Sequence, residues 1–186
     1  MRIIGGQWRG RRLFAPEGME TRPTSDKVRE ALFNIIRGDV YDARVWDVFA
    51  GSGALSLEAL SRGAESAVMT EASRKAAAAI KRNIELCGAG GKTRVIVSEW
   101  QAAVASLRGQ QFSLVFLDPP FRMTQAYADV VRRLLDEKML TEDALIVMEH
   151  AREAVLPELP AEVELFDTRQ YGDTRLSLVR LRGEEA

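Results

Sequence analysis

The sequence predicts an α/β fold in which a mostly parallel, doubly wound sheet of seven strands ends in an antiparallel hairpin. Between residues 44 and 148, short apolar segments of strand type alternate with helical segments, which is the pattern of strand–helix–strand units. The apolar segments are nearly continuous, as expected for strands that are buried on both faces. After residue 160 the pattern changes, because two strand segments follow each other with only a short turn between them.

The composition is that of a globular chain. Of 186 residues, 46% are hydrophobic and 28% are charged, and 26 Lys and Arg oppose 27 Asp and Glu for a net charge of −1. This balance excludes a uniformly basic, histone-like protein but leaves local nucleic-acid binding open. One cysteine and one histidine exclude an intramolecular disulfide and the usual zinc site, so we expect no metal. No apolar run reaches the roughly 18 residues of a membrane span, and we expect a cytoplasmic monomer without membrane contact.

The charges are unevenly distributed along the chain. Residues 1–37 contain eight basic and four acidic side chains, whereas the remainder has a surplus of acids. Two strand segments at residues 1–4 and 11–14, with glycines between them, predict a basic β-hairpin arm over residues 1–22, followed by the main domain at 23–186. Trp8 lies among the arginines, and an aromatic ring can stack on a base while Arg binds phosphate. The alternative is a solvated strand face that is merely rich in arginine.

The remaining elements follow from periodicity and capping signals. A loop is expected at residues 16–23, and Thr24 or Ser25 caps a helix that runs to about Arg37 and is stopped by Gly38. The apolar stripe of that helix leaves Lys27 and Arg29 on its other faces. Further strands are predicted at residues 44–49, 66–70, 93–97, 112–117, 144–148, 163–168 and 176–182, and further helices at 55–62, 73–87, 100–107 and 126–139.

A glycine-containing loop follows the strand predicted at residues 44–49. Gly51 and Gly53 allow a tight turn and close approach of the backbone to a ligand. Glu71 lies 20 residues beyond Gly51, where its carboxylate can accept hydrogen bonds from both hydroxyls of a ribose. A dinucleotide site would require a third glycine where Ser56 stands. The residues predicted to bind a cofactor at this turn are Asp47, Phe49, Gly51, Ser52, Gly53, Glu71 and Ala72.

The acidic end of this strand indicates which nucleotide is bound. Asp47 would repel a phosphate and attract a cation. S-adenosylmethionine has no phosphate and carries a sulfonium and an ammonium group, so the loop favours this cofactor. After the third strand, Glu99 can accept the adenine amino hydrogens and Trp100 can pack on the ring. The alternatives are a tight turn without a ligand and a Trp100 that belongs to the core.

The segment after the fourth strand carries the predicted catalytic residues, Asp118, Pro119, Pro120 and Phe121. It lies at the carboxyl edge of the sheet, where open α/β sheets bind ligands. The two prolines lack N–H groups and hold the backbone extended. Asp118 and the Pro119 carbonyl can then accept the two hydrogens of an exocyclic amine, and Phe121 can stack on a planar base. Two acceptors make such an amine more nucleophilic by favouring its developing positive charge.

Taken together, these features resemble one known family. A parallel sheet with a terminal antiparallel hairpin is usual in class I S-adenosylmethionine-dependent methyltransferases, whose fold is Rossmann-like. The segments MRIIGGQWRGRRL (1–13), RPTSDKVREALFN (22–34) and DVFAGSGALSLEALSRGA (47–64) resemble bacterial 16S ribosomal RNA guanine-N2 methyltransferases of the RsmD type. Aspartate or asparagine followed by two prolines and an aromatic is the signature of amino-group methyltransferases.

The resemblance implies methylation of the exocyclic N2 of one guanine in a loop of 16S rRNA, within a partly or fully assembled small ribosomal subunit. It assigns cofactor or catalytic roles to Gly51–Gly53, Glu71 and Asp118–Phe121. The residues expected to bind RNA are Arg9, Arg11, Arg12, Arg22, Thr24, Lys27 and Arg29. Of these, Arg22 and Thr24 are candidates for contact with the cofactor or the target base, although Arg22 can instead pair with an acid.

The sequence departs from the family in two places. Ala72-Ser73 follows Glu71 where relatives often have a more polar pair, and Glu99-Trp100 stands where many have Asp-Ala. Three other activities share parts of the pattern: a DNA methyltransferase acting on adenine N6 or cytosine N4, a protein-glutamine methyltransferase, and a Rossmann oxidoreductase. A non-catalytic RNA-binding assembly factor that retains S-adenosylmethionine is a further alternative.

Overall fold

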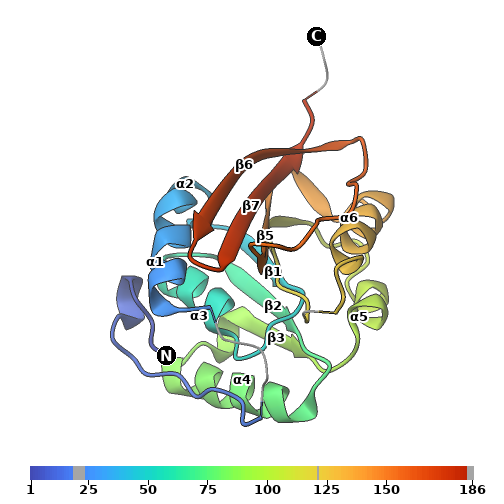
Figure 1. The fold of residues 1–186 in the computed structure, drawn as a ribbon. Coiled ribbons are helices and arrows are strands. Elements are labelled where there is room, and N and C mark those ends of the chain that lie inside the picture. Colours follow the sequence, from blue (N-terminus) through green and yellow to red (C-terminus); the bar gives the residue numbers. More distant parts are fainter. Residues whose placement is uncertain (19–23, 121, 184–186) are drawn as a thin grey trace.

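A computed structural model describes residues 1–18, 24–120 and 122–183. Its centre is one seven-stranded sheet with the order β3-β2-β1-β4-β5-β7-β6 (Figure 1). The first five strands pair in parallel and β7 pairs antiparallel with both β5 and β6, which confirms the predicted sheet and terminal hairpin. The strands are β1 (Arg44–Asp47), β2 (Ser66–Thr70), β3 (Thr93–Ile96), β4 (Phe112–Leu117), β5 (Leu140–Ala151), β6 (Val163–Tyr171) and β7 (Thr174–Leu181).

Helices cover both faces of the sheet, so that two apolar clusters form (Figure 1). One face packs against α1 (Asp26–Ile35), α2 (Arg37–Val40), α3 (Ala54–Ser61) and α4 (Arg74–Cys87). The other packs against α5 (Trp100–Ser106) and α6 (Ala126–Asp136). Alternate residues of a strand point to opposite faces, and Phe116 accordingly joins the first cluster while Leu117 joins the second. Among the described residues, no helix is both long and apolar enough to cross a membrane.

Several element boundaries differ from those predicted, and three of the differences have a clear physical cause. Ser25 caps α1 as expected, but the helix breaks at Ile36 (φ −92°, ψ 15°), so Gly38 lies inside the short α2 and does not end the helix. Strand β1 ends at Asp47, since the following residues turn into the glycine loop. Strand β5 extends to Ala151 because β7 pairs with it as far as Thr174, a long-range partner that the local pattern does not reveal.

The N-terminal segment, residues 1–14, packs against the domain. It folds back on itself around a 3-10 turn at Gly6–Trp8, but the two predicted strands are reduced to one antiparallel bridge between Arg2 and Arg12. Ile3, Trp8 and Leu13 are buried in the first cluster. The expectation that Trp8 stacks on a base is therefore wrong, because its ring is needed to attach the segment to the domain.

A buried glutamate of α3 anchors this segment. The carboxylate of Glu58, fully buried, accepts hydrogen bonds from the backbone N–H groups of Ile4 (2.9 Å) and Gly5 (2.8 Å) and from Nε of Arg62 (2.8 Å). Nε of Arg29 lies 3.6 Å from the same carboxylate. Arg29 is also fully buried, bonds Asp26 at 2.9 Å and donates to the carbonyl of Arg2. It is thus a structural cation, and the prediction that it binds RNA phosphate is wrong.

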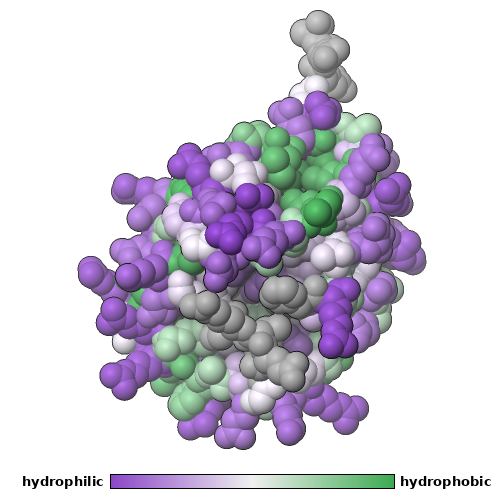
Figure 2. All heavy atoms as spheres, viewed as in Figure 1, coloured by the Kyte–Doolittle hydropathy of each residue, from purple (hydrophilic) through white to green (hydrophobic). Residues whose placement is uncertain are grey.

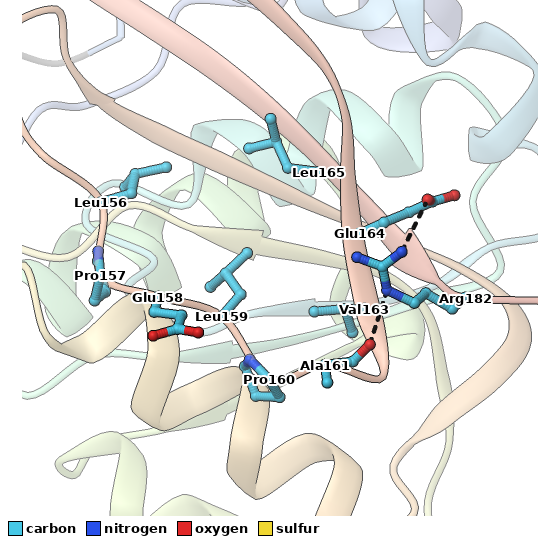
Figure 3. A pocket seen from close by; sticks show the side chains of 10 residues that line it. All are labelled: Leu156, Pro157, Glu158, Leu159, Pro160, Ala161, Val163, Glu164, Leu165 and Arg182. Carbon is cyan, nitrogen blue, oxygen red and sulfur yellow. Dashed lines mark hydrogen bonds and ion pairs between the residues drawn. The ribbon is translucent and has the colours of Figure 1, made fainter.

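The far end of the sheet carries an apolar hollow of about 490 Å³ (Figure 3). Its walls come from residues 156–161 and 163–165 and from Arg182, which donates to the Ala161 carbonyl at 2.8 Å. The face in Figure 2 is largely hydrophilic, with apolar side chains gathered toward the top of the view, near the end of β7. These walls lie on the β5–β6 connection and the start of β6, separate from the carboxyl ends of the parallel strands.

Glu58→Gln should lower the free energy of unfolding by about 3 kcal/mol, because the substitution removes the buried one of the two carboxylates that pair with the buried Arg29 cation. Urea denaturation followed by circular dichroism measures this change. Glu85→Gln, on the exposed face of α4, is the matched control and should change stability by less than about 0.5 kcal/mol. Equal stability of the two variants would show that Glu58 does not anchor the segment.

Candidate active site

Four carboxylates lie at the carboxyl ends of four adjacent strands. In sheet order they are Glu71 after β2, Asp47 at the end of β1, Asp118 after β4 and Glu149 near the end of β5. Asp47 pairs in register with Met69 and Phe116, and Leu117 pairs with Met148, so the next residues, Asp118 and Glu149, are neighbours. This edge is where open α/β sheets bind ligands.

The glycine loop after β1 is held by Glu71. Its two carboxylate oxygens accept the backbone N–H of Gly51 at 2.8 Å and of Ser73 at 2.9 Å. Gly51 (φ +58°) and Gly53 (φ +79°) adopt left-handed conformations that favour glycine. A Cβ on Gly53 would lie 3.1 Å from the sulfur of Met69, so the loop also lies tightly on β2. Each oxygen of the partly exposed Glu71 retains a lone pair, and the carboxylate therefore remains able to accept ribose hydroxyls.

Asn83 of α4 connects the same loop to the N-terminal segment. Its side-chain nitrogen donates to the carbonyls of Ser52 and Phe14, both at 2.9 Å, and its oxygen accepts the N–H of Phe14 at 2.7 Å. Asn83 is fully buried, so these bonds form in a protected environment. Asn83 thereby holds the end of the N-terminal segment next to the glycine loop, because it bonds both of them directly.

Asp47 is the most deeply buried of the four acids, with 1% of its surface exposed. Oδ2 accepts a hydrogen bond from Ser56 at 3.0 Å, whereas Oδ1 has no partner among the described residues. Burial raises the pKa of Asp47 to about 7, and the nearby Glu71 adds to the rise against the effect of the Ser56 bond. A buried oxygen without a partner is a position where a cationic ligand would be stabilised. Ser56, which stands in place of a third glycine, has a role in holding this carboxylate.

Asp118, Pro119 and Pro120 follow β4, the next strand along this edge of the sheet. Asp118 is half-buried, Pro119 is buried and Pro120 is exposed. Burial raises the pKa of Asp118 well above its usual range, and the carboxylates of Glu149 and Asp47 raise it further. The Pro120 carbonyl accepts the N–H of Met123 at 2.8 Å and starts the turn toward α6. Phe121, predicted to stack on the base, lies outside the described residues.

Glu149 and its partners complete the edge and were missed in the sequence. The Thr24 hydroxyl, just before α1, donates to Oε2 of Glu149 at 2.5 Å. The Tyr127 hydroxyl of α6 donates to the backbone carbonyl of Glu149 at 2.5 Å. Burial raises the pKa of Glu149, opposed by the Thr24 hydrogen bond and the Arg29 charge. The available signal was an acid directly after an apolar strand, which is also the position of Asp118.

The residues predicted to bind the cofactor near its adenine differ in exposure: some are accessible at the site, and one is buried in the core. Ala72 and Glu99 are exposed at the edge of the site, and Phe49 is partly buried against the second cluster. Trp100 begins α5 with only 6% of its surface exposed and belongs to the second cluster. Its ring is therefore a core component, which was the alternative interpretation from the sequence.

Comparisons with known proteins agree with this geometry. The model of the family described as conserved hypothetical protein 95 matches residues 1–180. The ribosomal RNA small subunit methyltransferase D of Escherichia coli strain K12 is 40% identical over 178 residues, covering 96% of this chain and 88% of the relative. The chain belongs to this family. A putative rRNA methyltransferase of Bacillus subtilis is 39% identical over 98% of this chain and all of the relative.

The solved structures extend the family assignment to the fold. A putative methyltransferase from Escherichia coli superposes with a TM-score of 0.85 at 40% identity and covers 97% of both chains. A putative methyltransferase solved in complex with SAH has a TM-score of 0.68 at 15% identity, with 83% of this chain covered and 48% of that one, which supports the fold alone. The predicted class I, Rossmann-like methyltransferase fold is thus confirmed, as is the resemblance to the RsmD-type family.

Most of the basic residues predicted to bind RNA are exposed in this methyltransferase family member. Arg9, Arg12 and Lys27 are exposed, and the exposed Arg11 donates to the Leu86 carbonyl at the end of α4 at 3.0 Å. Arg22 lies outside the described residues. Arg11 therefore lies beside α4, on the same face of the sheet as α3, which begins directly after Gly53 of the glycine loop.

The raised pKa of Asp47 predicts a pH-dependent stability. Between about pH 4 and pH 7 the folded carboxyl keeps its proton while the unfolded one loses it, so its contribution to stability falls as the pH rises. The stability of the wild type relative to Asp47→Asn should therefore fall by up to about 1.4 kcal/mol per pH unit in this window. Urea unfolding at several pH values measures it. Asp136→Asn, at an exposed site on α6, should give a profile parallel to wild type; a parallel profile for Asp47→Asn would contradict the prediction.

Proposed function

We propose that this protein transfers a methyl group from S-adenosylmethionine to the exocyclic N2 amine of a guanine in 16S rRNA of the small ribosomal subunit. The observation that carries the proposal is the position of Asp118 and the two prolines directly beside Asp47 and the glycine loop on one sheet edge. Family membership supports rRNA methylation, and the chemistry of the edge supports an amine as acceptor.

The residues of the edge fit the cofactor. Glu71 would bind the ribose hydroxyls while it holds the loop through Gly51. Asp47, with one buried oxygen unpartnered, would stabilise the positive charge of the methionine end of the cofactor. When bound, S-adenosylmethionine supplies an electrophilic methyl carbon attached to a sulfonium. An acidic, phosphate-repelling edge suits this cation better than a dinucleotide.

The residues that would bind the methyl-accepting amine lie at the carboxyl end of β4. Asp118 and the carbonyl of Pro119 would accept the two N–H groups of the amine, directing its lone pair toward the methyl carbon. A new C–N bond then forms while the sulfur–carbon bond breaks, and the sulfur keeps the bonding electron pair. Because the pKa of Asp118 is raised, this carboxylate can take the proton that the methylated amine loses. Alignment of two bound reactants would supply most of the rate enhancement.

The RNA-binding surface would be formed by the N-terminal segment together with α4. Phe14 is 37% exposed, and the guanidinium carbon of Arg82 lies 3.4 Å from its ring centroid. Phe14 therefore offers the accessible aromatic that Trp8 does not. The exposed basic side chains of the N-terminal segment and of α4 would bind phosphates and position the RNA without reading its sequence; they are Arg9, Arg11, Arg12, Lys75, Lys81 and Arg82.

The proposal is tested by transfer of labelled methyl from S-adenosylmethionine to small subunits that lack the modification. Naked 16S rRNA and duplex DNA are assayed in parallel, and the labelled nucleic acid is digested to nucleosides. N2-methylguanosine from subunits is the expected product of a cytoplasmic, monomeric enzyme that acts on a partly or fully assembled particle. Label in DNA, or no label despite cofactor binding, would overturn the substrate assignment.

Asp118→Ala should reduce kcat by at least about 100-fold, since it removes one of two acceptors for the amine. The affinity for S-adenosylmethionine, measured by isothermal titration calorimetry, should change little because the residues proposed to bind the cofactor lie at or just after the ends of β1, β2 and β3 and do not include Asp118. Asp129→Ala, on the exposed face of α6, is the control and should leave kcat unchanged. Full activity of Asp118→Ala would exclude the proposed acceptor role.

Simultaneous replacement of Arg9, Arg11 and Arg12 by Gln should weaken RNA binding and flatten its dependence on salt. Each lost contact with a single-stranded phosphate lowers the slope of log K against log salt by about 0.7, so the slope should fall by about 2. The matched control replaces Arg108, Arg132 and Arg133, three exposed arginines next to or within the helices on the other face of the sheet. If both triple variants show the wild-type slope, the N-terminal segment does not bind phosphate.

A further inference from the structure

Glu149 occupies a position in the site that the proposed chemistry leaves without a role. Leu117 of β4 pairs with Met148 of β5, so Asp118 and Glu149 follow on adjacent parallel strands. Such strands lie about 4.8 Å apart, a separation that two acidic side chains can close. Phe116 and Val147 belong to the cluster under α1, and by the two-residue period of a strand Asp118 and Glu149 point to that same face.

Two hydrogen bonds and burial fix Glu149 in place. Thr24 donates its hydroxyl to Oε2 at 2.5 Å, and Tyr127 donates to the backbone carbonyl at 2.5 Å. Glu149 itself is buried, with only 8% of its surface exposed. Within residues 1–18, 24–120 and 122–183, Oε1 accepts no hydrogen bond, although Oε2 is taken. A buried carboxylate held by one oxygen next to the acceptor for the amine has the other oxygen available for the substrate.

We propose that Glu149 determines the specificity for guanine, by accepting the N1–H of the target base while Asp118 and the Pro119 carbonyl hold its N2 amine. This inference rests on the proposed function and names the residue that would select its base. Guanine presents two adjacent donors, N1–H and N2–H, along one edge, and two adjacent carboxylates present the matching acceptors.

The same arrangement rejects the other amino bases. In adenine the N6 amine lies beside N1, and in cytosine the N4 amine lies beside N3; both ring nitrogens are acceptors. Either would direct a lone pair at the Glu149 carboxylate, so one buried acceptor would face another without a proton between them. Glu149 would thus separate a guanine-N2 enzyme from the adenine and cytosine methyltransferases that share the Asp-Pro-Pro chemistry.

Burial raises the pKa of Glu149, but two of its neighbours favour the ionised, acceptor form. The Thr24 hydroxyl stabilises the ionised carboxylate by donating to it, and the buried Arg29 guanidinium lowers the pKa of Glu149 against the effect of burial. The same arginine pairs with Glu58 and Asp26. The cation that ties the N-terminal segment to the domain therefore also supports the carboxylate that would read the base.

The test uses small subunits reconstituted with 16S rRNA that carries either guanine or 2,6-diaminopurine at the methylated position. Diaminopurine keeps the 2-amino group but has an acceptor at N1. Wild type should prefer guanine in kcat/KM by about 10- to 100-fold. In Glu149→Gln the amide N–H can donate to N1 of diaminopurine, so the preference should disappear or reverse, whereas a merely structural defect would lower both values equally.

The controls make each outcome decisive. Glu153→Gln, an exposed glutamate just beyond β5, should keep the wild-type preference. If Glu149→Gln does not fold, Thr24→Val, which removes the hydroxyl that orients the carboxylate, should still reduce the preference. A folded Glu149→Gln that keeps the wild-type preference overturns the inference while leaving the proposed function intact. Wild type that forms no N2-methylguanosine overturns the proposed function, and the inference with it.

Discussion

The crowding of carboxylates at one edge of the sheet is the constraint on which the rest of the site depends. Burial penalises charge, and the acids raise one another's pKa: Asp118 responds to Glu149 and Asp47, and Asp47 responds to Glu71. Packing alone would favour apolar residues at these strand ends. The edge is stable because each of three acids has a dedicated donor, namely Ser56 for Asp47, Thr24 for Glu149 and backbone N–H groups for Glu71. Locally unfavourable electrostatics of this kind are typical of functional sites.

The N-terminal segment and α1 form the second half of this arrangement. Glu58 and Asn83 bind the backbone of the segment through buried hydrogen bonds. Asn83 also binds the Ser52 carbonyl, so the segment and the cofactor loop share one polar network. Arg29 contributes a positive charge to the same side of the sheet, close enough to affect Glu149. The segment is therefore part of the support of the site, and in the proposed function its exposed arginines and Phe14 would contact RNA.

Local signals in the sequence predicted most of the fold. The cap at Ser25, the short turn between the last two strands and the apolar run of β4 each act within a few residues, so their consequences can be predicted from the local sequence. The glycine loop and its partner Glu71 were found for the same reason, since their spacing along the chain is fixed by one strand–helix–strand unit. The errors concern long-range partners. Nothing in the sequence near Arg29 or Trp8 indicates that Arg29 pairs with Glu58 of α3, or that the backbone N–H of Trp8 donates to the Ser61 hydroxyl of the same helix.

Glu149 was missed in the sequence for the same reason, because its partners are distant along the chain. Its hydrogen-bond partner Thr24 is 125 residues away in sequence, and its neighbour Asp118 becomes adjacent only through the pairing of β4 with β5. Yet the sheet order converts four distant acids into a linear series from β2 to β5. In that series the ribose, the cationic cofactor, the acceptor amine and the base edge would each meet one carboxylate. A single structural rule, that ligands bind at the carboxyl ends of parallel strands, would then place the groups for both the proposed chemistry and the proposed choice of base at one edge.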